Sequence, residues 1–581
     1  MTTLATAHAT RAPRWIIPKP PDEQAVKDLA AALSLPEVVC RLLLIRGYVT
    51  PEEAKLFLRP KLDRLHDPLS FLSMDKAVER LARAVRDKEL VFIHGDYDVD
   101  GISSTTLLTK TIRGLGGVAT PFIPLRLEHG YDLSDAGVEA AVAAGAKVVV
   151  TCDCGTSAVG PVAKLCKLGI DVIVTDHHLP GGDLPNCLSV LNPKRPGCGY
   201  PDKDLAAVGV AFKLALALAR TLGKNENFIW AMLDLVALAT VADVAPLRGE
   251  NRVFVRYGLK MLAETRNIGM RALIRAAGLE GKQLTAGRIG FILAPRLNAA
   301  GRLDKAIRGV ELLMTDNEHE ANSIARELEE LNHRRQEIDR ATQEQARERV
   351  QQLDLDETFG LVLADDNWHP GVVGIVASRL VEEFGRPTVL IALSGDIGKG
   401  SGRSISKFDL HAGLGLCRDV LLRFGGHRAA AGVTIERERI ADFTARFNEV
   451  ARAQLTPEDL VPEIRVDLEV SIEGLDEKIE SLFRHFEPFG VGNPAPVLLC
   501  RDVRISTAPR TVGRDGLKLV LDTGTGTLEA LAWGLADRAS EFAAGSRVDI
   551  AFRLERDEYR GYSYLQARVA DIRPATPATA A

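Results

Sequence analysis

From residue 90 onward, short apolar runs alternate with stretches of helical periodicity. The apolar runs lie at 90–94, 120–124, 147–152 and 171–175. They are apolar throughout rather than at every second position, which is typical of strands buried on both faces of a parallel sheet. The intervening helical patterns lie at 102–113, 134–144 and 157–168. The pattern predicts a doubly wound parallel α/β sheet, with any ligand site at the carboxyl ends of its strands.

A second pattern predicts one long helix after this sheet. Residues 316–352 contain neither Gly nor Pro, and apolar residues recur at helical steps, at Ile324, Leu328, Leu331 and Ile338. A helix of about 35 residues is far longer than the mean of about 11–12 and typically joins two lobes. A coiled-coil dimer is the alternative, but the apolar seam is too short to favour it.

The remaining segments predict smaller units. Residues 21–88 have helical spacing and are expected to cap the first domain. Residues 353–452 carry strands near 359–364 and 387–392, then a Gly-rich turn at 395–402, and predict a second α/β unit. Five short alternating strands follow, at 503–506, 517–521, 528–533, 547–555 and 563–572. Five such strands in this length suit an OB-fold β-barrel.

Length and composition fit this division. A chain of 581 residues favours three or four domains. The expected boundaries are an N-terminal extension and cap at 1–88, the first α/β domain at 89–315, the helix at 316–352, the second α/β domain at 353–455 and the barrel at 462–575. With 46% hydrophobic residues and no membrane-length apolar run, we expect a soluble protein without a secretory signal. Eight sparse cysteines suit a reduced, cytoplasmic chain.

The sequence HGDYDVDG, residues 94–101, is the sharpest chemical feature. Asp96, Asp98 and Asp100 follow an apolar strand and precede a helix. Two like charges 4 Å apart cost about 4 kcal/mol at an effective dielectric near 20, so a cation is expected there. A calcium EF-hand loop begins in the same way but needs a Glu at its twelfth position, which here is Leu107.

Further carboxylate and imidazole groups follow other strands of the predicted sheet. Asp153 ends the run 147–152, Asp176, His177 and His178 follow the run 171–175, and Asp243 lies in ATVADVAPL. Oxygen and imidazole ligands without thiolate suit Mn²⁺ or Mg²⁺ better than structural zinc. About seven such ligands fit two metals, which can activate a water and stabilise phosphoryl transfer. No Ser or Cys lies in a triad-like context beside a His.

Taken together, HGDYDVDG, TCDCG, TDHH and ATVADVAPL resemble the four ordered motifs of the DHH phosphoesterase superfamily. APRLNAAGR, HPGVVGIVASRL, GKGSGRSIS, FGGHRAAAG and FEPFGVGNPAP resemble its RecJ branch. The resemblance covers about residues 40–575. It implies a 5′→3′ exonuclease that acts on single-stranded DNA with two Mn²⁺ or Mg²⁺ ions, in DNA repair and recombination.

The resemblance also implies residue roles. His94, Asp98 and Asp153 would hold one metal, and Asp100, Asp153, His177 and Asp243 the other. Asp153 would bridge the two, Asp96 would lie beside them, and His178 would touch the scissile phosphate or orient the site. The assignment of His94 is the weakest, because a supporting role looks the same in sequence.

A nuclease must also hold the phosphate backbone. Arg296 and Arg302 lie in a locally basic stretch, and Arg302 is the favoured contact to the scissile or neighbouring phosphate, because Arg pairs with phosphate in a bidentate manner. The family likeness suggests that Ser401 and Arg403, assisted by Arg126, bind the terminal 5′ phosphate. Such a pocket explains 5′ polarity. His369 and His427 are expected to line the cleft between lobes, although a packed structural role is equally compatible with either.

In the barrel, aromatic and basic residues interleave, as in OB-folds that stack single strands. The candidates are Trp533, Phe552, Tyr559, Tyr562 and Tyr564 with Arg553, Arg556, Arg560 and Arg568. About half of the aromatics belong to the barrel core by this interpretation, and the sequence does not separate them. The net charge of −5 means that any nucleic-acid surface is local.

Two other functions remain as alternatives. Small DHH phosphoesterases acting on short oligonucleotides or cyclic dinucleotides share the metal motifs but generally lack the long helix and barrel. A replication scaffold would have lost metal ligands, and all are present here. One departure from the family pattern is Cys154, where Asn is expected after Asp153. We expect a monomer; a single-strand-binding protein and a helicase are candidate partners.

Overall fold

The computed structural model describes residues 12–130, 132–559 and 562–575. The chain forms two compact units. One comprises Lys55–His333 and His485–Ala495, and the other comprises Met1–Ala54, Arg334–Arg484 and Pro496–Ala581. Each unit is described by itself below.

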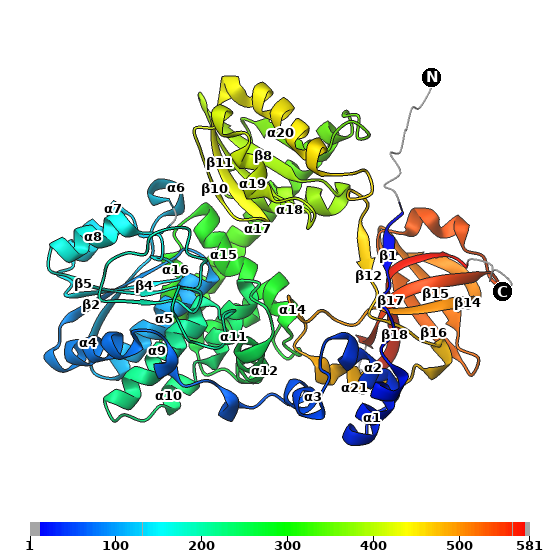
Figure 1. The fold of residues 1–581 in the computed structure, drawn as a ribbon, viewed down its shortest axis with the longest axis horizontal. Helices are drawn as coiled ribbons and strands as arrows, with labels where there is room; N and C mark the ends of the chain where they lie inside the picture. The colour runs from blue at the N-terminus through cyan, green and yellow to red at the C-terminus, as the bar shows by residue number, and fades with distance from the viewer. Residues whose placement is uncertain (1–11, 131, 560–561, 576–581) are drawn as a thin grey trace. The chain divides into compact units, whose positions relative to one another are not determined.

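The first unit is built on a five-stranded sheet of order β3-β2-β4-β5-β6, in which every pairing is parallel (Figure 1). Its strands are β2 (Leu90–Gly95), β3 (Val118–Phe122), β4 (Val148–Cys152), β5 (Asp171–Thr175) and β6 (Ser189–Leu191). The chain steps from β2 outward to β3, then returns to the other side of β2 for β4. The carboxyl ends of β2 and β4 therefore flank the topological switch point, where open α/β sheets bind ligands.

Helices cover both faces of this sheet. They are α4 (Met74–Asp87), α5 (Val99–Gly114), α7 (Asp135–Ala143), α8 (Val159–Lys167) and α9 (Ala207–Thr221), and the short α6 (Arg126–His129) follows β3. Helices α4, α5 and α9 share one apolar core with the sheet, whereas α7 and α8 pack on the opposite face. The doubly wound architecture and the four predicted strands are thereby confirmed, because residues such as Val149 and Val150 alternate between two buried cores.

A helical layer completes the first unit. It contains α10 (Asn227–Trp230), α11 (Leu233–Ala242), α12 (Gly249–Ala263), α13 (Ile268–Ala276), α14 (Ala286–Arg288), a π-helical turn η3 (Ile289–Leu293), α15 (Ala294–Leu303) and α16 (Ile307–Met314). The predicted long helix is present as α17 (Glu318–Val350), with 33 residues; its residues up to His333 belong to the first unit and those from Arg334 to the second. Its apolar positions Ile324 and Leu328 are buried in the core of the first unit.

The second unit contains a mixed sheet of order β10-β11-β9-β8-β7. Its strands are β7 (Leu361–Asp365), β8 (Thr388–Ser394), β9 (Ile397–Arg403), β10 (Arg423–Gly426) and β11 (Ala430–Glu436), with α18 (Val373–Phe384), α19 (Leu410–Gly415) and α20 (Ile440–Gln454) packed around it.

One prediction in this sheet was wrong: 395–402 is mostly a strand rather than a Gly-rich turn. The turn covers only the residues between Ser394 and Ile397, and β9 pairs with both β8 and β11. Glycines at alternate positions leave room for neighbouring side chains on one face of β9. A Cβ on Gly398 would lie 2.6 Å from Ile391 Cγ2, and one on Gly400 would lie 2.6 Å from Val433 Cγ2.

The C-terminal sheet closes into a barrel. Strands β14 (Leu498–Val512), β15 (Gly516–Asp522), β16 (Thr527–Ala532), β17 (Arg547–Tyr559) and β18 (Tyr562–Pro574) have the order β14-β15-β16-β18-β17, and β17 pairs back with β14. The short β13 (Leu468–Glu469) pairs with the start of β14 in parallel, and α21 (Glu477–Phe483) lies against β17. The predicted five-stranded OB-fold is confirmed.

The N-terminal segment differs from its predicted place. Strand β1 (Arg14–Ile16) pairs with β12 (Glu463–Arg465), and α2 (Glu37–Ile45), which packs on α1 (Glu23–Leu33), contacts α21. These residues therefore complete the barrel-containing unit, because their apolar faces are covered there. Only the part after α3 (Pro51–Leu58), notably α4, packs on the first sheet.

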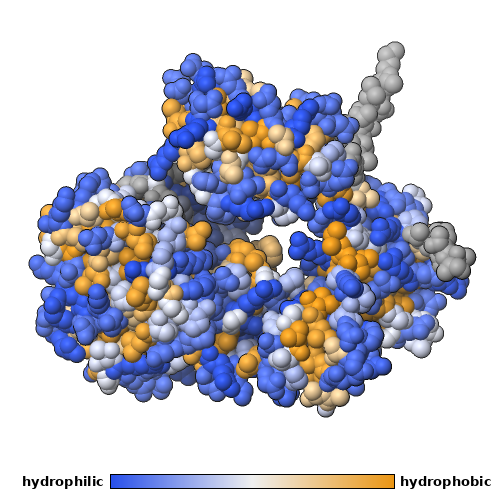
Figure 2. Space-filling view, in the orientation of Figure 1, coloured by the Kyte–Doolittle hydropathy of each residue, from blue (hydrophilic) through white to orange (hydrophobic). Residues whose placement is uncertain are grey.

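Hydrophilic residues cover most of the face shown in Figure 2, and the hydrophobic residues form separate patches. Among the described residues, no helix combines the length and the apolar character that crossing a membrane requires.

Candidate metal centre

Four segments bring acidic and histidine side chains to the switch point of the first sheet. Asp96 follows β2, and Asp98 caps the N-terminus of α5 by accepting hydrogen bonds from the backbone N–H groups of Asp100 (2.9 Å) and Gly101 (3.2 Å). Asp153 follows β4, residues 176–178 follow β5, and Asp243 caps the C-terminus of α11. The strand ends, rather than a contiguous loop, assemble the site.

Within the described residues, three groups of possible metal ligands share members. In each group the ligand atoms lie within 4.8 Å of one another. The groups are Asp100, His177 and Asp243; Asp153, His177 and His178; and Asp96, Asp98 and Asp153. Asp153 and His177 each belong to two groups, so the arrangement is one connected cluster wide enough for two cations.

The electrostatics of this cluster favour a bound cation. Burial, followed by the charge of Asp98, raises the pKa of Asp153 well above its usual range. Burial likewise raises the pKa of Asp100 to about 7 and that of Asp243 well above its ordinary value. Carboxylates that repel one another in a buried site are stabilised by a divalent ion, which reverses the local field.

Unsatisfied polar atoms support the same conclusion. Within the described residues, Asp96 Oδ1, Asp153 Oδ1 and His177 Nε2 are buried and have no hydrogen-bond partner. Asp153 Oδ1 and His177 Nε2 lie 3.2 Å apart, and His177 Nε2 lies 3.6 Å from Asp243 Oδ2. Buried polar atoms are nearly always paired, so atoms of this kind that converge on one point fit Mn²⁺ or Mg²⁺.

The two adjacent histidines have different environments. Burial lowers the pKa of His177 to about 3, so its imidazole is neutral and able to ligate a metal. Burial also disfavours the charged form of His178, but its hydrogen bond to Asp176, at 2.7 Å between Nδ1 and Oδ1, raises its pKa to about 9. The side chain of His178 is 46% exposed. A charged imidazole at the rim suits a phosphate contact better than metal ligation, and this role stays a prediction.

Asp153 lies in a strained turn that its neighbours hold in place. Its φ is +62°, a conformation that non-glycine residues adopt uncommonly and that clusters at functional sites. The Asp153 N–H donates to Thr175 O (2.9 Å), and Thr151 Oγ1 donates to Cys154 O (2.7 Å). Asp132 Oδ1 accepts from the N–H of Gly155 at 2.7 Å. The sequence pattern did not reveal Asp132, because it lies outside every motif.

His94 occupies a buried place beside the cluster but belongs to none of the three described groups. Its Nδ1 lies 3.6 Å from Cys154 Sγ, and its ring centroid lies 5.4 Å from that of Phe122. Asp96, expected only nearby, occupies the group with Asp98 and Asp153 instead. The role of His94 as a metal ligand stays a prediction.

Helix α15 contacts the segment that carries Asp96, Asp98 and Asp100, called the acidic loop below (residues 96–100). Asn298 Oδ1 accepts from the N–H of Val99 at 3.1 Å. A Cβ on Gly301 would lie 2.3 Å from Tyr97 O, so only glycine permits this approach. Arg302 lies four residues after Asn298, hence on the same helix face. From the other side, the Arg126 guanidinium lies 4.7 Å from the centroid of the Tyr97 ring.

Arg296 is placed differently from Arg302. Its guanidinium forms two hydrogen bonds with the carboxylate of Glu329 on α17, the second at 3.0 Å between Nη2 and Oε1. This pair fastens α15 to the long helix. A phosphate contact by Arg296 stays a prediction.

In the second unit, the candidate phosphate-binding residues gather at one end of β9. Arg403 Nη1 donates to Ser401 Oγ at 3.0 Å. Both side chains face the start of α18, where a Cβ on Gly374 would lie 2.8 Å from Ser401 Oγ. His369 precedes that helix and accepts from the Gly371 N–H at 3.0 Å. His427 lies in the turn between β10 and β11, and Ala430 of β11 pairs with Arg403.

The candidate nucleic-acid-binding residues of the barrel differ in their exposure and in their ion pairs. Trp533 is 51% exposed and Arg553 is exposed, whereas Phe552 is fully buried. Arg556 is paired with Glu480 (2.8 Å) and Glu477 (3.1 Å). Arg560 lies outside the described residues, as do the side chains of Tyr559 and Tyr562.

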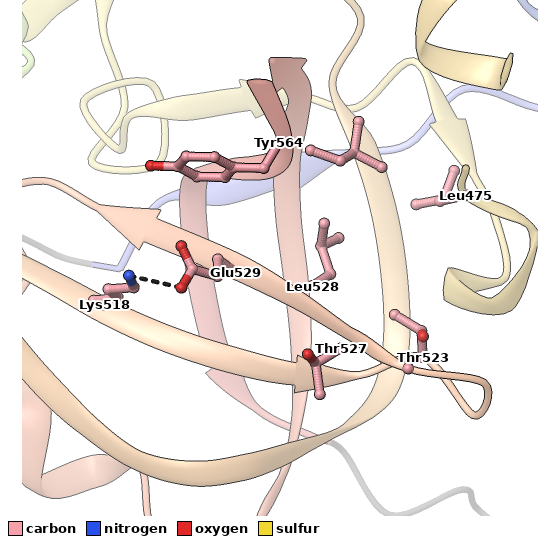
Figure 3. Close-up of a pocket in the computed structure, with 9 residues that line it drawn as sticks. Leu475, Lys518, Thr523, Thr527, Leu528, Glu529 and Tyr564 are labelled. Atoms are coloured by element: carbon pink, nitrogen blue, oxygen red, sulfur yellow. Dashed lines mark ion pairs between the residues drawn. The ribbon is translucent and has the colours of Figure 1, made fainter. Parts of the chain in front are cut away.

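A groove of about 570 Å³ crosses β15, β16 and β18. Figure 3 shows Tyr564 above it, with Leu475 and Leu528 on one side and the Lys518–Glu529 ion pair on the other. The hydroxyl of Tyr564 donates to Asp557 Oδ2 at 2.7 Å. The groove therefore offers both an aromatic ring and charged groups on the barrel surface.

Comparison with known proteins identifies the family. Residues 90–240 match the DHH family N-terminal domain, residues 357–453 match the DHHA1 domain, and residues 466–571 match the RecJ OB domain. Two relatives are named single-stranded-DNA-specific exonuclease RecJ. That of Bacillus subtilis is 37% identical over 96% of this chain and 70% of its own length, and that of Escherichia coli is 37% identical over 95% and 98%.

Comparison with solved structures indicates the same family. The chain matches RecJ of Thermus thermophilus in complex with Mn²⁺ with a TM-score of 0.83 and 32% identity, over 97% of this chain and 80% of that one. The Mg²⁺ complex of that RecJ gives a TM-score of 0.78 over 97% and 79% of the two chains, at 30% identity. The expected resemblance and the expected choice of Mn²⁺ or Mg²⁺ are confirmed. The chain belongs to the RecJ family of DHH-superfamily exonucleases.

Proposed function

We propose that this chain degrades single-stranded DNA from its 5′ end and releases 5′-mononucleotides by two-metal hydrolysis. The observation that carries the proposal is the connected cluster around Asp153 and His177, with buried ligand atoms that have no hydrogen-bond partner among the residues that the structure describes. Relatives that match this chain almost end to end are named single-stranded-DNA-specific exonucleases.

The cluster divides into two sets of ligands around a common carboxylate. Asp100, His177 and Asp243 would hold one ion, and Asp96 and Asp98 the other, with Asp153 facing both. Ions held there would generate hydroxide near neutral pH and neutralise charge on the phosphoryl oxygens. His177 can ligate a metal because burial lowers its pKa to about 3, which leaves its imidazole neutral at neutral pH.

Cationic side chains at the rim would bind the phosphate itself. His178, whose pKa Asp176 raises to about 9, keeps a proton at neutral pH and can donate it in a hydrogen bond to a phosphoryl oxygen. Arg302 lies on the face of α15 that attaches to the acidic loop, and Arg126 stacks on Tyr97. Arginine binds phosphate through two parallel hydrogen bonds, which orients the phosphorus for in-line attack.

We further propose that Ser401 and Arg403 bind the terminal 5′ phosphate. The hydroxyl and guanidinium point together toward the N-terminus of a helix of 12 residues, where backbone N–H groups favour an anion. The barrel would hold the rest of the strand through Trp533 and Arg553.

We also propose an oligomeric state, a location in the cell and partner proteins. The apolar residues of α17 in the first unit, Ile324 and Leu328, are buried within that unit, which supports a monomer over a coiled-coil dimer. A cytoplasmic location, with a single-strand-binding protein and a helicase as partners, fits a repair nuclease whose substrate needs unwinding and protection.

The test is a digest of single-stranded DNA with Mn²⁺, labelled at the 5′ or the 3′ end. We expect early release of a 5′-labelled mononucleotide, no release by Asp153→Ala, and no attack on a blunt duplex. Arg403→Gln should abolish the preference for a 5′ phosphate over a 5′ hydroxyl while Mn²⁺ dependence persists. Cleavage only of short oligonucleotides or cyclic dinucleotides, or early release of 3′ label, would overturn the proposal.

A further inference from the structure

The segment at residues 485–495 has an unusual place in the chain. It contains all but the last residue of the motif FEPFGVGNPAP. The segment belongs to the first unit, whereas Arg484 before it and Pro496 after it belong to the second. Backbone N–H and C=O groups that are removed from water need hydrogen-bond partners. The partners of this segment therefore show what holds it in the first unit.

Three arginines of one helix face hold the segment. Arg248, Arg252 and Arg256 follow one another at steps of four residues, at the N-cap of α12 and within it, and so lie on the same side. Arg252 is 3% exposed and donates to two backbone carbonyls of the segment, at 2.8 and 3.2 Å. Arg256 Nη1 donates to Glu487 O at 2.9 Å. Arg248 Nε donates to Gly492 O at 2.7 Å.

The later part of the segment is a tight turn, residues 490–493. The backbone N–H groups of Gly490 and Asn493 donate to each other's carbonyls, at 2.9 and 3.1 Å. Val491 O, at the tip of the turn, accepts from the N–H of Leu247 at 2.7 Å. A Cβ on Gly490 would lie 2.7 Å from Leu247 Cδ1, so the turn approaches this closely only with glycine there.

Leu247 lies four residues after Asp243, and the chain between them is constrained. Asp243 is the C-cap of α11, and Val244 has a φ of +61°, an outlying conformation for a β-branched residue. The N–H of Ala245 donates back to Thr240 O at 3.3 Å. Such strain persists only where the surrounding structure enforces it. Helix α11 holds the loop from one side, and the turn 490–493 holds it from the other.

Asp243 needs such an anchor more than the other ligands of its group. Asp100 and His177 follow strands of the first sheet closely, whereas Asp243 follows a helix. Asp243 Oδ2 lies 3.6 Å from His177 Nε2, within the group of possible metal ligands. Metal–oxygen bonds of small divalent ions tolerate little displacement of a ligand. A shift of the loop after α11 would therefore weaken the ion that this group would hold.

We propose that the turn 490–493 positions Asp243 for metal binding, through the Val491–Leu247 hydrogen bond and the contact with Arg248. Arg248 and Gly490 are then positioning residues, which act through Asp243. The proposal rests on the proposed two-metal function and adds a support that the metal centre requires. The earlier part of the segment, which Arg252 and Arg256 hold, contributes to stability alone.

The test compares Arg248→Ala and Gly490→Ala with Arg256→Ala in the full chain. Arg248 is exposed, so its substitution leaves the core intact. Arg256→Ala is the matched control, because Arg256 holds the same segment at a carbonyl away from Asp243. Arg248→Lys is the conservative variant. The readouts are Mn²⁺ binding by calorimetric titration without DNA, thermal unfolding in EDTA, and the Mn²⁺ dependence of single-strand digestion.

We expect Arg248→Ala and Gly490→Ala to weaken one of two bound Mn²⁺ ions by about tenfold and to leave the other unchanged. This is the low end of the range for groups that support metal ligands. The half-saturating Mn²⁺ concentration in digestion should rise equally, with kcat recovered at saturating Mn²⁺. Arg248→Lys should restore most of the affinity. Arg256→Ala should lower the melting temperature and bind Mn²⁺ as the wild type does.

Two results would refute the positioning role. One is wild-type affinity for both ions in Arg248→Ala and Gly490→Ala. The other is an equal loss of affinity in Arg256→Ala, which would reflect general destabilisation. A wild type that binds two Mn²⁺ ions but leaves single strands intact would overturn the exonuclease proposal instead, and the binding comparison would still decide this one.

Discussion

Replacing Asp153 with Asn should separate stability from activity in one experiment. Asn is nearly isosteric with Asp but carries no charge, and Asp153 Oδ1 has no hydrogen-bond partner to lose within the described residues. Four neighbouring carboxylates raise its pKa in addition to burial: Asp98, Asp100, Asp243 and Asp96. The substitution therefore removes repulsion from the metal-free protein and a shared ligand from the metal-bound one.

The magnitude follows from the charges. One pair of like charges about 4 Å apart costs about 4 kcal/mol at an effective dielectric near 20. Proton uptake limits this cost, so we expect Asp153→Asn to raise the metal-free free energy of unfolding of the first unit by about 1–4 kcal/mol. At about 2–4 °C per kcal/mol, the melting temperature in EDTA should rise by at least about 2 °C. Activity with Mn²⁺ should fall by about 10³-fold or more.

The assay is thermal unfolding in EDTA and in Mn²⁺, together with digestion of end-labelled single strands. The wild type should gain stability with Mn²⁺, and Asp153→Asn should lose most of that gain. Asp234→Asn is the control, because Asp234 is a buried carboxylate that accepts from Thr265 Oγ1 outside the cluster. It should destabilise the protein and keep the Mn²⁺ response. A less stable Asp153→Asn variant with an unchanged Mn²⁺ response would refute this reasoning.

Three other predictions follow. Burial raises the pKa of Asp100 from 3.8 to about 7, so the metal-free folded state binds a proton that the unfolded chain lacks between about pH 4 and 7; melting temperature in EDTA should rise as the pH falls through 7, and a monotonic fall would contradict this. Cys154→Asn should keep activity within tenfold of the wild type in single-strand digestion, because Cys154 Sγ lies 3.6 Å from His94 Nδ1 and belongs to none of the three described groups of possible metal ligands; a larger loss would show that the thiol is essential. Arg556→Ala should destabilise the barrel, because it leaves the nearly buried Glu480 with one partner fewer, whereas exposed Arg553→Ala should mainly weaken single-strand binding in an anisotropy titration; equal effects would argue against this separation.

The sequence predicts most of the first unit because its signals are local. Strands buried on both faces must be apolar throughout, and the structure places all four predicted runs, including 147–152, within one residue or two of β2 to β5. The acidic residues at strand ends then converge because parallel strands share one carboxyl edge. The same logic failed at 395–402, where the need for glycine arises from Ile391 and Val433 on neighbouring strands. Such a contact is not visible along the chain.

Supporting residues were missed for a related reason. Asp132 acts through a backbone N–H of Gly155, and Asn298 acts through that of Val99. Asp132 belongs to none of the motifs described above, and although Asn298 lies within APRLNAAGR, that motif does not show which group Asn298 binds. Each of the two lies far in sequence from the group it holds. Arg296 shows the reverse: its motif suggested phosphate, but its guanidinium is bound to Glu329. Residue type alone does not distinguish a substrate contact from an internal ion pair.

The strain and the repulsion at the metal centre have a common physical meaning. Asp153 is held at positive φ in a buried group of like charges, and both features cost free energy in the metal-free protein. Bonds from Thr151 and to Thr175 and Asp132 fix the turn despite this cost, so the ligands do not need to reorganise when a cation binds. Binding then releases the repulsion, and the same free energy that makes the empty site unfavourable adds to metal affinity. A site built in this way couples the stability of the first unit to the ions that its chemistry requires.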